Sequence, residues 1–259
     1  SMYIANNAFA SCDALKTIEL PAYTTYIGAS AFEGTPLTTF TIPESVTTLG
    51  AKALKGTKIT EIVIPANVET IGDGAFAQCA SLKTLTFAEG DKPLTLGTVA
   101  NKDKTGGVFC GTAITEVAFA DRITLIGAYA FYNQTSLTTV TMGPNSNVTE
   151  IGKYAFAGCK SLKDVTITSD KVKYGAYAFT GCRALENFYV NASVLPEGMF
   201  YECENLSKVT IGPDVNDIGT FAFRSTKVDT FELKGKNSAF QVLNGNVIVS
   251  ADGKKLIAV

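Results

Sequence analysis

One pattern of 17 residues recurs along nearly the whole chain and limits what the chain can fold into. Its clearest copy runs from Ile151 to Ile167 and reads Ile-Gly-x-x-Ala-Phe-x-x-Cys-x-x-Leu-x-x-Val-x-Ile. The Phe position of this pattern occurs ten times, at Phe9, Phe32, Leu54, Phe76, Phe109, Phe131, Phe156, Phe179, Phe200 and Phe223. These markers lie 21 to 25 residues apart, except for one interval of 33 residues after Phe76, which holds an insertion. A fixed period of this length predicts a solenoid with one continuous core.

Each copy also carries an apolar triplet with the spacing i, i+3, i+5, as in Leu162, Val165 and Ile167. The last two members alternate with polar residues and are often β-branched, which predicts a short strand with one buried face. Proline follows several triplets, for example at Pro43 and Pro65, and ends the strand because it has no N–H group to donate. We therefore expect one short parallel strand in each repeat.

The segment after each strand is predicted to turn at Ile-Gly and then to form about one turn of helix, in which Ala and Phe point inward. The expected fold is a right-handed, horseshoe-like α/β solenoid of about ten repeats over residues 1–233. From residue 234 the pattern changes, and Asn244-Gly245 and Asp252-Gly253 between apolar runs are hairpin turn signals. We expect residues 234–259 to form a β-hairpin cap of the same domain.

With proline after its last apolar residue, the pattern resembles the BspA-like leucine-rich-repeat family over roughly residues 4–233. The tail from Val242 to Ile257 resembles the hairpin that often closes such arrays. The chain departs from the pattern at Leu54, which replaces Phe, and where Thr replaces Cys at Thr35, Thr57, Thr112 and Thr226. The resemblance implies a leucine-rich-repeat solenoid in an exported or surface-attached bacterial protein, with an adhesive or binding role and no catalytic residue set.

The chain of 259 residues contains no histidine, and its 22 basic and 24 acidic residues leave a net charge of −2. Without histidine it lacks the usual general base and a common metal ligand, which argues against an enzyme. A nearly neutral chain has little electrostatic attraction for nucleic acid. No apolar run approaches the roughly 18 residues of a membrane span. We therefore expect no catalytic site, cofactor, metal, nucleic-acid partner or transmembrane segment.

Five of the six cysteines share one position of the pattern, three residues after the marker, and these are Cys12, Cys79, Cys159, Cys182 and Cys203. Stacked neighbours in this position could form a disulfide or a metal site. Other copies place Thr there, and Thr can do neither. We therefore favour a column of small buried side chains.

The outward side of the predicted strands is rich in Thr, and the residues that interrupt it are candidate contacts: Glu61, Glu116, Asp164, Asn187 and Tyr189. A Thr array could bind ordered water, but Thr pairs across strands also stabilise any sheet. Solenoids commonly bind partners on an extended concave surface. We therefore predict that this strand surface is concave and binds a partner.

The 33-residue interval supplies a second candidate site, because insertions in repeats form loops on one face, often the binding face. The candidate contacts in this loop, residues 98–107, are Asn101, Lys102, Asp103 and Lys104. The alternative is a mobile surface loop without a binding role.

These expectations describe an extracellular or cell-surface, non-enzymatic module for adhesion or protein binding. The chain starts inside a repeat at Ser1, so we expect the signal or anchor segment to lie outside this sequence. The expected partners are host or neighbouring-cell surface proteins or matrix. One alternative is a structural spacer that presents another domain. The other is a glycan-binding protein that uses Tyr189 or the tyrosines beside the predicted helical turn, Tyr129, Tyr154, Tyr177 and Tyr201.

Overall fold

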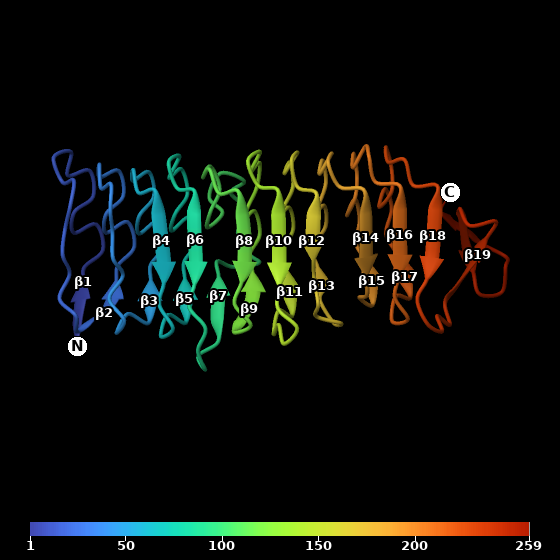
Figure 1. Cartoon of the computed structure of the whole chain (residues 1–259), viewed down its shortest axis with the longest axis horizontal. Helices are drawn as coiled ribbons and strands as arrows, with labels where there is room; N and C mark the ends of the chain where they lie inside the picture. Colours follow the sequence, from blue (N-terminus) through green and yellow to red (C-terminus); the bar gives the residue numbers. More distant parts are fainter. Residues whose placement is uncertain (259) are drawn as a thin grey trace.

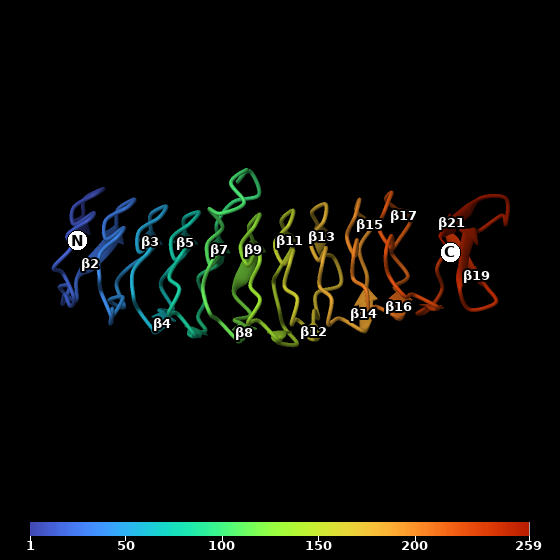
Figure 2. The ribbon, with the colours of Figure 1, turned by 90° about the horizontal axis from the view of Figure 1, so that it is seen from above.

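A computed structural model describes residues 1–258 of the chain as a stack of about ten coils, with the N-terminus at one end and the C-terminus at the other (Figure 1). Each of the coils from Thr60 to Leu233 contributes strands to two opposite sides of the stack, and the apolar core lies between them (Figure 2). The repeat solenoid predicted from the sequence is therefore confirmed.

The first side, which we call the triplet face, contains the strands predicted from the apolar triplets. The triplets of the first two coils, in residues 15–20 and 37–42, lie outside any strand. The hydrogen-bonded groups are β4 with β6, then β8, β10 and β12, then β14, β16 and β18. The bounds are β4 (Glu61–Ile64), β6 (Thr84–Phe87), β8 (Glu116–Phe119), β10 (Thr139–Met142), β12 (Asp164–Thr166), β14 (Asn187–Val190), β16 (Lys208–Ile211) and β18 (Thr230–Leu233).

The second side, which we call the Ile-Gly face, contains strands that the sequence analysis did not predict. Eight of them form one continuous parallel sheet, and β15 pairs with β17 beyond it. Most of these strands end at the apolar residue before the Gly of the pattern. The bounds are β1 (Met2–Ile4), β2 (Thr24–Ile27), β3 (Thr48–Leu49), β5 (Thr70–Ile71), β7 (Leu94–Leu96), β9 (Ile123–Ile126), β11 (Glu150–Ile151), β13 (Lys173–Tyr174), β15 (Val194–Leu195) and β17 (Asp217–Ile218).

The predicted helical turn is wrong, because residues 1–258 contain no helix, and the fold is a β-solenoid and not α/β. Around Phe156, the backbone is left-handed two residues before, at Tyr154 (φ 55°), and two residues after, at Gly158 (φ 73°). The Phe156 N–H donates to Ala178 O of the next coil at 2.8 Å. In a helix it would donate four residues back in its own coil. Bonds to the next coil therefore replace helical bonds along this segment, which we call the turn edge.

The stack runs almost straight and does not curve into a horseshoe (Figure 1; Figure 2). A horseshoe needs one side wider than the other, as when helices about 10 Å across lie behind strands about 4.8 Å apart. Here both sides carry strands, so both sides have the same repeat distance. The triplet face is consequently not concave.

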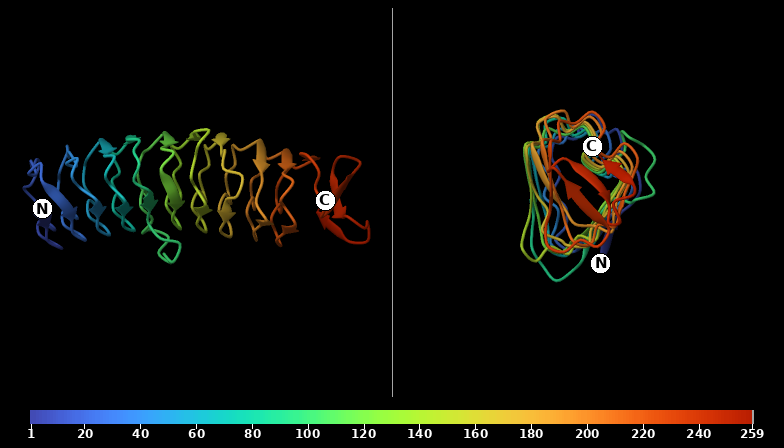
Figure 3. Two further views of the ribbon diagram at one scale, coloured as in Figure 1. Left: turned by 90° about the horizontal axis from the view of Figure 1, so that it is seen from below. Right: turned by 90° about the vertical axis from the view of Figure 1, so that its right-hand side faces the viewer.

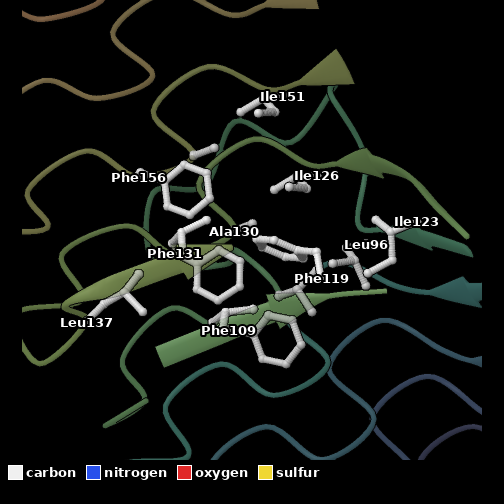
Figure 4. Close-up of a cluster of buried hydrophobic side chains, with 14 of the residues drawn as sticks. Leu96, Phe109, Phe119, Ile123, Ile126, Ala130, Phe131, Leu137, Ile151 and Phe156 are labelled. Carbon is white, nitrogen blue, oxygen red and sulfur yellow. The ribbon is translucent and has the colours of Figure 1, made fainter. Parts of the chain in front are cut away.

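The Phe markers form an internal column, as the period requires (Figure 4). The ring centroids of Phe109 and Phe131 lie 5.2 Å apart, and those of Phe131 and Phe156 lie 5.3 Å apart with nearly parallel planes. Phe119 of β8 meets Phe131 edge-on at 5.8 Å. Each aromatic pair contributes about 0.5–1.5 kcal/mol beyond its burial. The column is interrupted at Leu54, which is also fully buried.

The cysteines form the expected buried column in four coils, whereas Cys12 in the first coil is exposed. All six thiols are free. The Cys159 thiol donates to Phe131 O at 3.2 Å, and the Cys182 thiol donates to Phe156 O at 3.2 Å, in each case a carbonyl of the preceding coil. The buried thiols of this column therefore satisfy backbone carbonyls beside the Phe column.

One buried arginine, Arg122, holds the first part of the insertion, around residues 88–92, by hydrogen bonds. Arg122 is only 4% exposed. Its guanidinium donates to Val68 O at 2.6 Å, Pro65 O at 2.8 Å, Ala88 O at 2.8 Å and Lys92 O at 3.2 Å. Burial lowers the pKa of Arg122, and its bonds to four carbonyls compensate for lost hydration. The added residues after β6 are thus tied to the coil before them.

The C-terminal segment forms three antiparallel strands where a hairpin was expected: β19 (Phe240–Leu243), β20 (Val247–Ser250) and β21 (Leu256–Ala258). The first turn uses Asn244 and Gly245 in left-handed conformations, as the Asn-Gly signal predicts. Phe240 and Ile248 pack against the last coils as part of the core. The Phe231 N–H of β18 donates to Gly245 O at 2.7 Å, so this segment covers the triplet side of the stack end.

The Gly of Ile-Gly is required because the backbone of the preceding coil lies too close for a side chain. A left-handed φ is not the reason at this position. A Cβ atom on Gly152 would lie 2.4 Å from Ala128 N of the preceding coil. Gly181 differs, because its φ is +71° and a Cβ atom there would meet nothing closer than 3.6 Å. The two glycines therefore have separate physical causes.

This contrast predicts unequal effects of one methyl group. We expect Gly152→Ala to lower the free energy of unfolding by about 3 kcal/mol or more, because two backbones must separate. We expect Gly181→Ala to cost about 1–2 kcal/mol, the strain of a left-handed alanine. Urea denaturation followed by circular dichroism measures both. Equal losses would contradict the close-approach explanation.

The cysteine column predicts which thiols react in the folded protein. The thiolate is the reactive form, and burial raises the pKa of Cys159 to about 12 and that of Cys110 to about 11. We expect Ellman's reagent to modify Cys12 rapidly in the native chain and all six thiols in urea. A Cys12→Ser variant should lose the rapid phase. Rapid native reaction of more than one thiol would contradict this assignment.

Candidate functional site

The triplet face brings together all five strand residues predicted as contacts. Glu61, Glu116, Asp164 and Asn187 are the first residues of β4, β8, β12 and β14, and Tyr189 is the third residue of β14. Exposed and buried residues alternate along these strands, so first and third residues face solvent. The first four are exposed and Tyr189 is half-buried. Their role in binding stays a prediction.

The acidic residues of this face are separated by hydroxyl side chains. Glu116 lies directly opposite Thr139, and Thr139 lies directly opposite Asp164. Glu61 lies opposite Thr84. This register gives the N-terminal part of the face a row of carboxylates and hydroxyls, which accept hydrogen bonds and attract cationic groups.

A trough of about 340 Å³ lies in this part of the face. Its floor includes Ala118, which lies directly opposite Thr141 of β10. Ala is smaller than the Thr found at this position in neighbouring strands, so the surface is lower there. Lys83 and Glu116 border the trough with opposite charges. Its lining residues are Lys83, Thr84, Leu85, Thr86, Thr115, Glu116, Val117, Ala118, Thr139 and Thr141.

Charges in the C-terminal part of the face pair with one another. Lys208 Nζ lies 3.0 Å from Glu232 Oε1, although both side chains are about half exposed, so the pair contributes little stability. Lys234 Nζ lies 4.7 Å from the centre of the Tyr189 ring. Burial raises the pKa of Tyr189, and the negative charges of Asp170 and Asp214 raise it further.

The loop residues lie apart from the triplet face. Figure 2 shows the loop after β7 projecting on the Ile-Gly side, away from β8 and β12. Asp103 Oδ1 accepts hydrogen bonds from the Thr105 N–H (2.9 Å) and hydroxyl (2.8 Å), which lowers the pKa of Asp103. Asn101 Nδ2 donates to Ala128 O at 3.3 Å. Lys102 and Lys104 are exposed. The two predicted sites cannot contact one small ligand together.

Tyrosines form a second column on the turn edge. The rings of Tyr129, Tyr154 and Tyr177 stack with centroids 5.2 Å apart, and Tyr201 meets Tyr177 edge-on at 6.4 Å. A hydrogen bond from the Tyr177 hydroxyl to Glu197 raises the pKa of Tyr177. Because stacked rings cover one another, the column presents mainly ring edges and hydroxyl groups.

The sequence did not predict the trough at Ala118 or a cleft of about 420 Å³ between the last coil and β21. The trough does have a signal in the sequence, because Glu116-Val117-Ala118 replaces the Thr-x-Thr pattern of the neighbouring strands. Within residues 1–258, no group of three or more His, Cys, Asp or Glu residues could hold a metal ion. In the same part of the chain, no helix is long and apolar enough to cross a membrane.

A solved structure of a bacterial protein shares this fold. A leucine-rich repeat protein from Bacteroides ovatus is 24% identical, with a TM-score of 0.63 over 86% of this chain and 61% of its own. This chain thus spans less than two thirds of that relative. The pneumococcal vaccine antigen PcpA (17% identity, TM-score 0.49) matches 94% of this chain and 76% of its own. A leucine rich cell surface protein from Faecalibacterium prausnitzii (17% identity, TM-score 0.37) matches 90% and 83%.

The repeat pattern itself identifies the family. The model of the BspA type leucine rich repeat region, with 6 copies, matches residues 2–101 and 105–229. These ranges include both strand faces and the turn edge of nearly every coil. No curated protein matches the chain. The match covers most of the chain and agrees with the stacked coils, so the chain belongs to the BspA type leucine-rich-repeat family.

Proposed function

We propose that this chain is a non-enzymatic protein-binding module of the bacterial cell surface or exterior, and that the triplet face contacts its partner. The surface location rests on the family, whose resemblance implies exported proteins. The partner class is a host or neighbouring-cell surface protein or a matrix protein. Adhesion follows if that partner is fixed to another cell or to matrix.

One observation carries the choice of the triplet face. Its eight strands present outward side chains from residue 61 to residue 233 on one side of the stack. Extended surfaces of this kind are the usual binding sites of solenoid proteins. The trough beside Glu116 is the hollow on this face, and its carboxylate and hydroxyl groups suit a basic side chain of a partner protein.

A spacer is the second candidate, and the straightness of the stack favours it (Figure 1). Successive coils are joined by backbone hydrogen bonds on the turn edge and along most of both strand faces, with the strand pairing interrupted between β6 and β8, between β12 and β14, and between β13 and β15. Such a rod would hold a neighbouring domain at a fixed distance without binding anything itself.

The tyrosines expected to contact a glycan do not favour that alternative in the same way. Lys234 lies over the Tyr189 ring, and the rings of Tyr129, Tyr154 and Tyr177 stack on one another. Open ring faces suited to stacking against a sugar are therefore few on these residues.

The protein-binding proposal predicts that filling the trough abolishes recognition. Ala118 is exposed, so Ala118→Phe places a ring between Thr86 and Thr141 without entering the core. We expect at least about a tenfold loss of affinity for any partner found by screening immobilised host matrix proteins, because a buried contact is lost. Surface plasmon resonance measures the loss.

Two control variants make this test specific. Thr70→Phe adds a ring to the opposite, Ile-Gly face on β5, where Thr70 is exposed, and should bind within about twofold of the unchanged chain. A variant with Asn101, Lys102, Asp103 and Lys104 changed to Ala tests the loop. Loss of binding in the loop variant alone would move the contact to the loop. Absence of saturable binding in the whole screen would favour the spacer.

A further inference from the structure

On the turn edge, the N–H groups of the marker Phe and of the residues two before and two after it point toward the C-terminal end of the stack. The Phe156 N–H donates to Ala178 O, and the Gly158 N–H donates to Thr180 O, both at 2.8 Å. One coil before the end, the Phe200 N–H donates to Ala222 O at 2.9 Å. Each coil therefore presents alternate N–H groups to the coil that follows it.

Residues 234–258 form β19, β20 and β21, and not a further coil that could accept these bonds. Phe221, Phe223 and Ser225 occupy the positions of Gly198, Phe200 and Glu202 in the coil before. Within residues 1–258, none of their three N–H groups donates a hydrogen bond. By the repeat geometry, these donors point out of the end of the stack. A row of backbone donors without partners is an incomplete structure that a ligand can extend.

The C-terminal strands leave this row uncovered. Seen from the end, β19, β20 and β21 cross the outline of the coils (Figure 3). A cleft of about 420 Å³ remains between residues 218–224 of the last coil and residues 255–258 on β21. Within the described chain, β21 pairs only with β20. The cleft thus has unpaired backbone on the coil and a strand edge facing it.

The side chains of the cleft specify the chemistry of a ligand. Phe221 is 49% exposed and Leu256 is 60% exposed, so both offer apolar surface. Arg224 and Lys255 supply positive charge, and the Arg224 guanidinium lies 5.2 Å from the centre of the Phe221 ring. None of the described lining residues is a carboxylate. A pocket of about 180 Å³ adjoins the cleft and is lined by Tyr177, Tyr201, Phe221 and Arg224.

We propose that this cleft binds an acidic peptide segment of a partner protein. The peptide oxygens accept hydrogen bonds from the N–H groups of Phe221, Phe223 and Ser225, and its carboxylates pair with Arg224 and Lys255. Apolar peptide side chains lie against Phe221 and Leu256. Inorganic phosphate would satisfy the donors and charges but would leave these apolar walls open to water. The site is separate from the triplet face, so it does not depend on the function proposed for that face.

The first experiment locates the binding. Isotope-labelled chain is titrated with the acetylated and amidated peptide Glu-Ile-Glu-Phe-Glu and with its counterpart in which Lys replaces Glu. We expect the acidic peptide to shift the amide resonances of Phe221, Phe223 and Ser225 in a saturable way, while the basic peptide leaves them unchanged. Absence of shifts at these amides, or equal shifts with the basic peptide, overturns the proposal. So does an equally tight response to inorganic phosphate.

A matched pair of variants tests the charges. Arg224→Glu with Lys255→Glu should weaken the acidic peptide at least about tenfold, because both attractive charges are reversed. Lys160→Glu with Arg183→Glu changes the net charge equally on the turn edge of inner coils, where the following coil already accepts the N–H bonds. This control should change affinity by less than about twofold. Equal losses in both variants would show unspecific attraction and overturn the proposal.

A steric variant separates this site from the trough. Thr220 lines the cleft and is exposed, so Thr220→Trp should block the peptide while the protein keeps its thermal unfolding midpoint. Ala118→Phe should leave peptide affinity unchanged. A loss caused by Ala118→Phe but not by Thr220→Trp would place the peptide on the triplet face and overturn the cleft assignment.

Discussion

Backbone hydrogen bonds between successive coils set the spacing on which the rest of the structure depends. They hold equivalent residues about 4.8 Å apart along the axis, so each side chain meets its own counterpart in the next coil. Phe rings then stack at 5.2 to 5.4 Å in the regular part of the column, and tyrosines do the same on the turn edge. The same spacing leaves no room for a Cβ atom at Gly152. It also makes the stack straight, because both faces repeat at one distance.

The period predicted the solenoid, the Phe column and most triplet strands, because a repeated apolar residue must face a repeated partner. The missing helix could not be predicted from Ala-Tyr-Ala-Phe alone, since bonds to the next coil select the left-handed residues at Tyr154 and Gly158. A signal did exist in the glycines two residues after the marker, at Gly34, Gly56, Gly111, Gly158 and Gly181. The strands of the Ile-Gly face escaped notice because several contain only two residues, as in β11.

Alternation along each strand was enough to place Glu61, Glu116, Asp164, Asn187 and Tyr189 on one side of the sheet. The side of the stack on which loop 98–107 projects could not be predicted from the sequence, because it depends on the path of the whole coil. The trough at Ala118 depends on the size of neighbours in other repeats, so it emerges only when strands are placed side by side. The cleft beside β21 is defined by bonds that are not made, which no local pattern reports.

The alignment of hydrogen bonds with the stack axis has a mechanical consequence. A tether pulling the two ends apart loads the bonds between coils along their own direction, so they open one coil at a time from an end. Each released repeat of about 22 residues extends to about 75 Å, since a stretched chain spans about 3.4 Å per residue. A chain held by a partner at one end and a cell at the other would therefore lengthen stepwise under shear flow, absorbing extension before its attachments are strained.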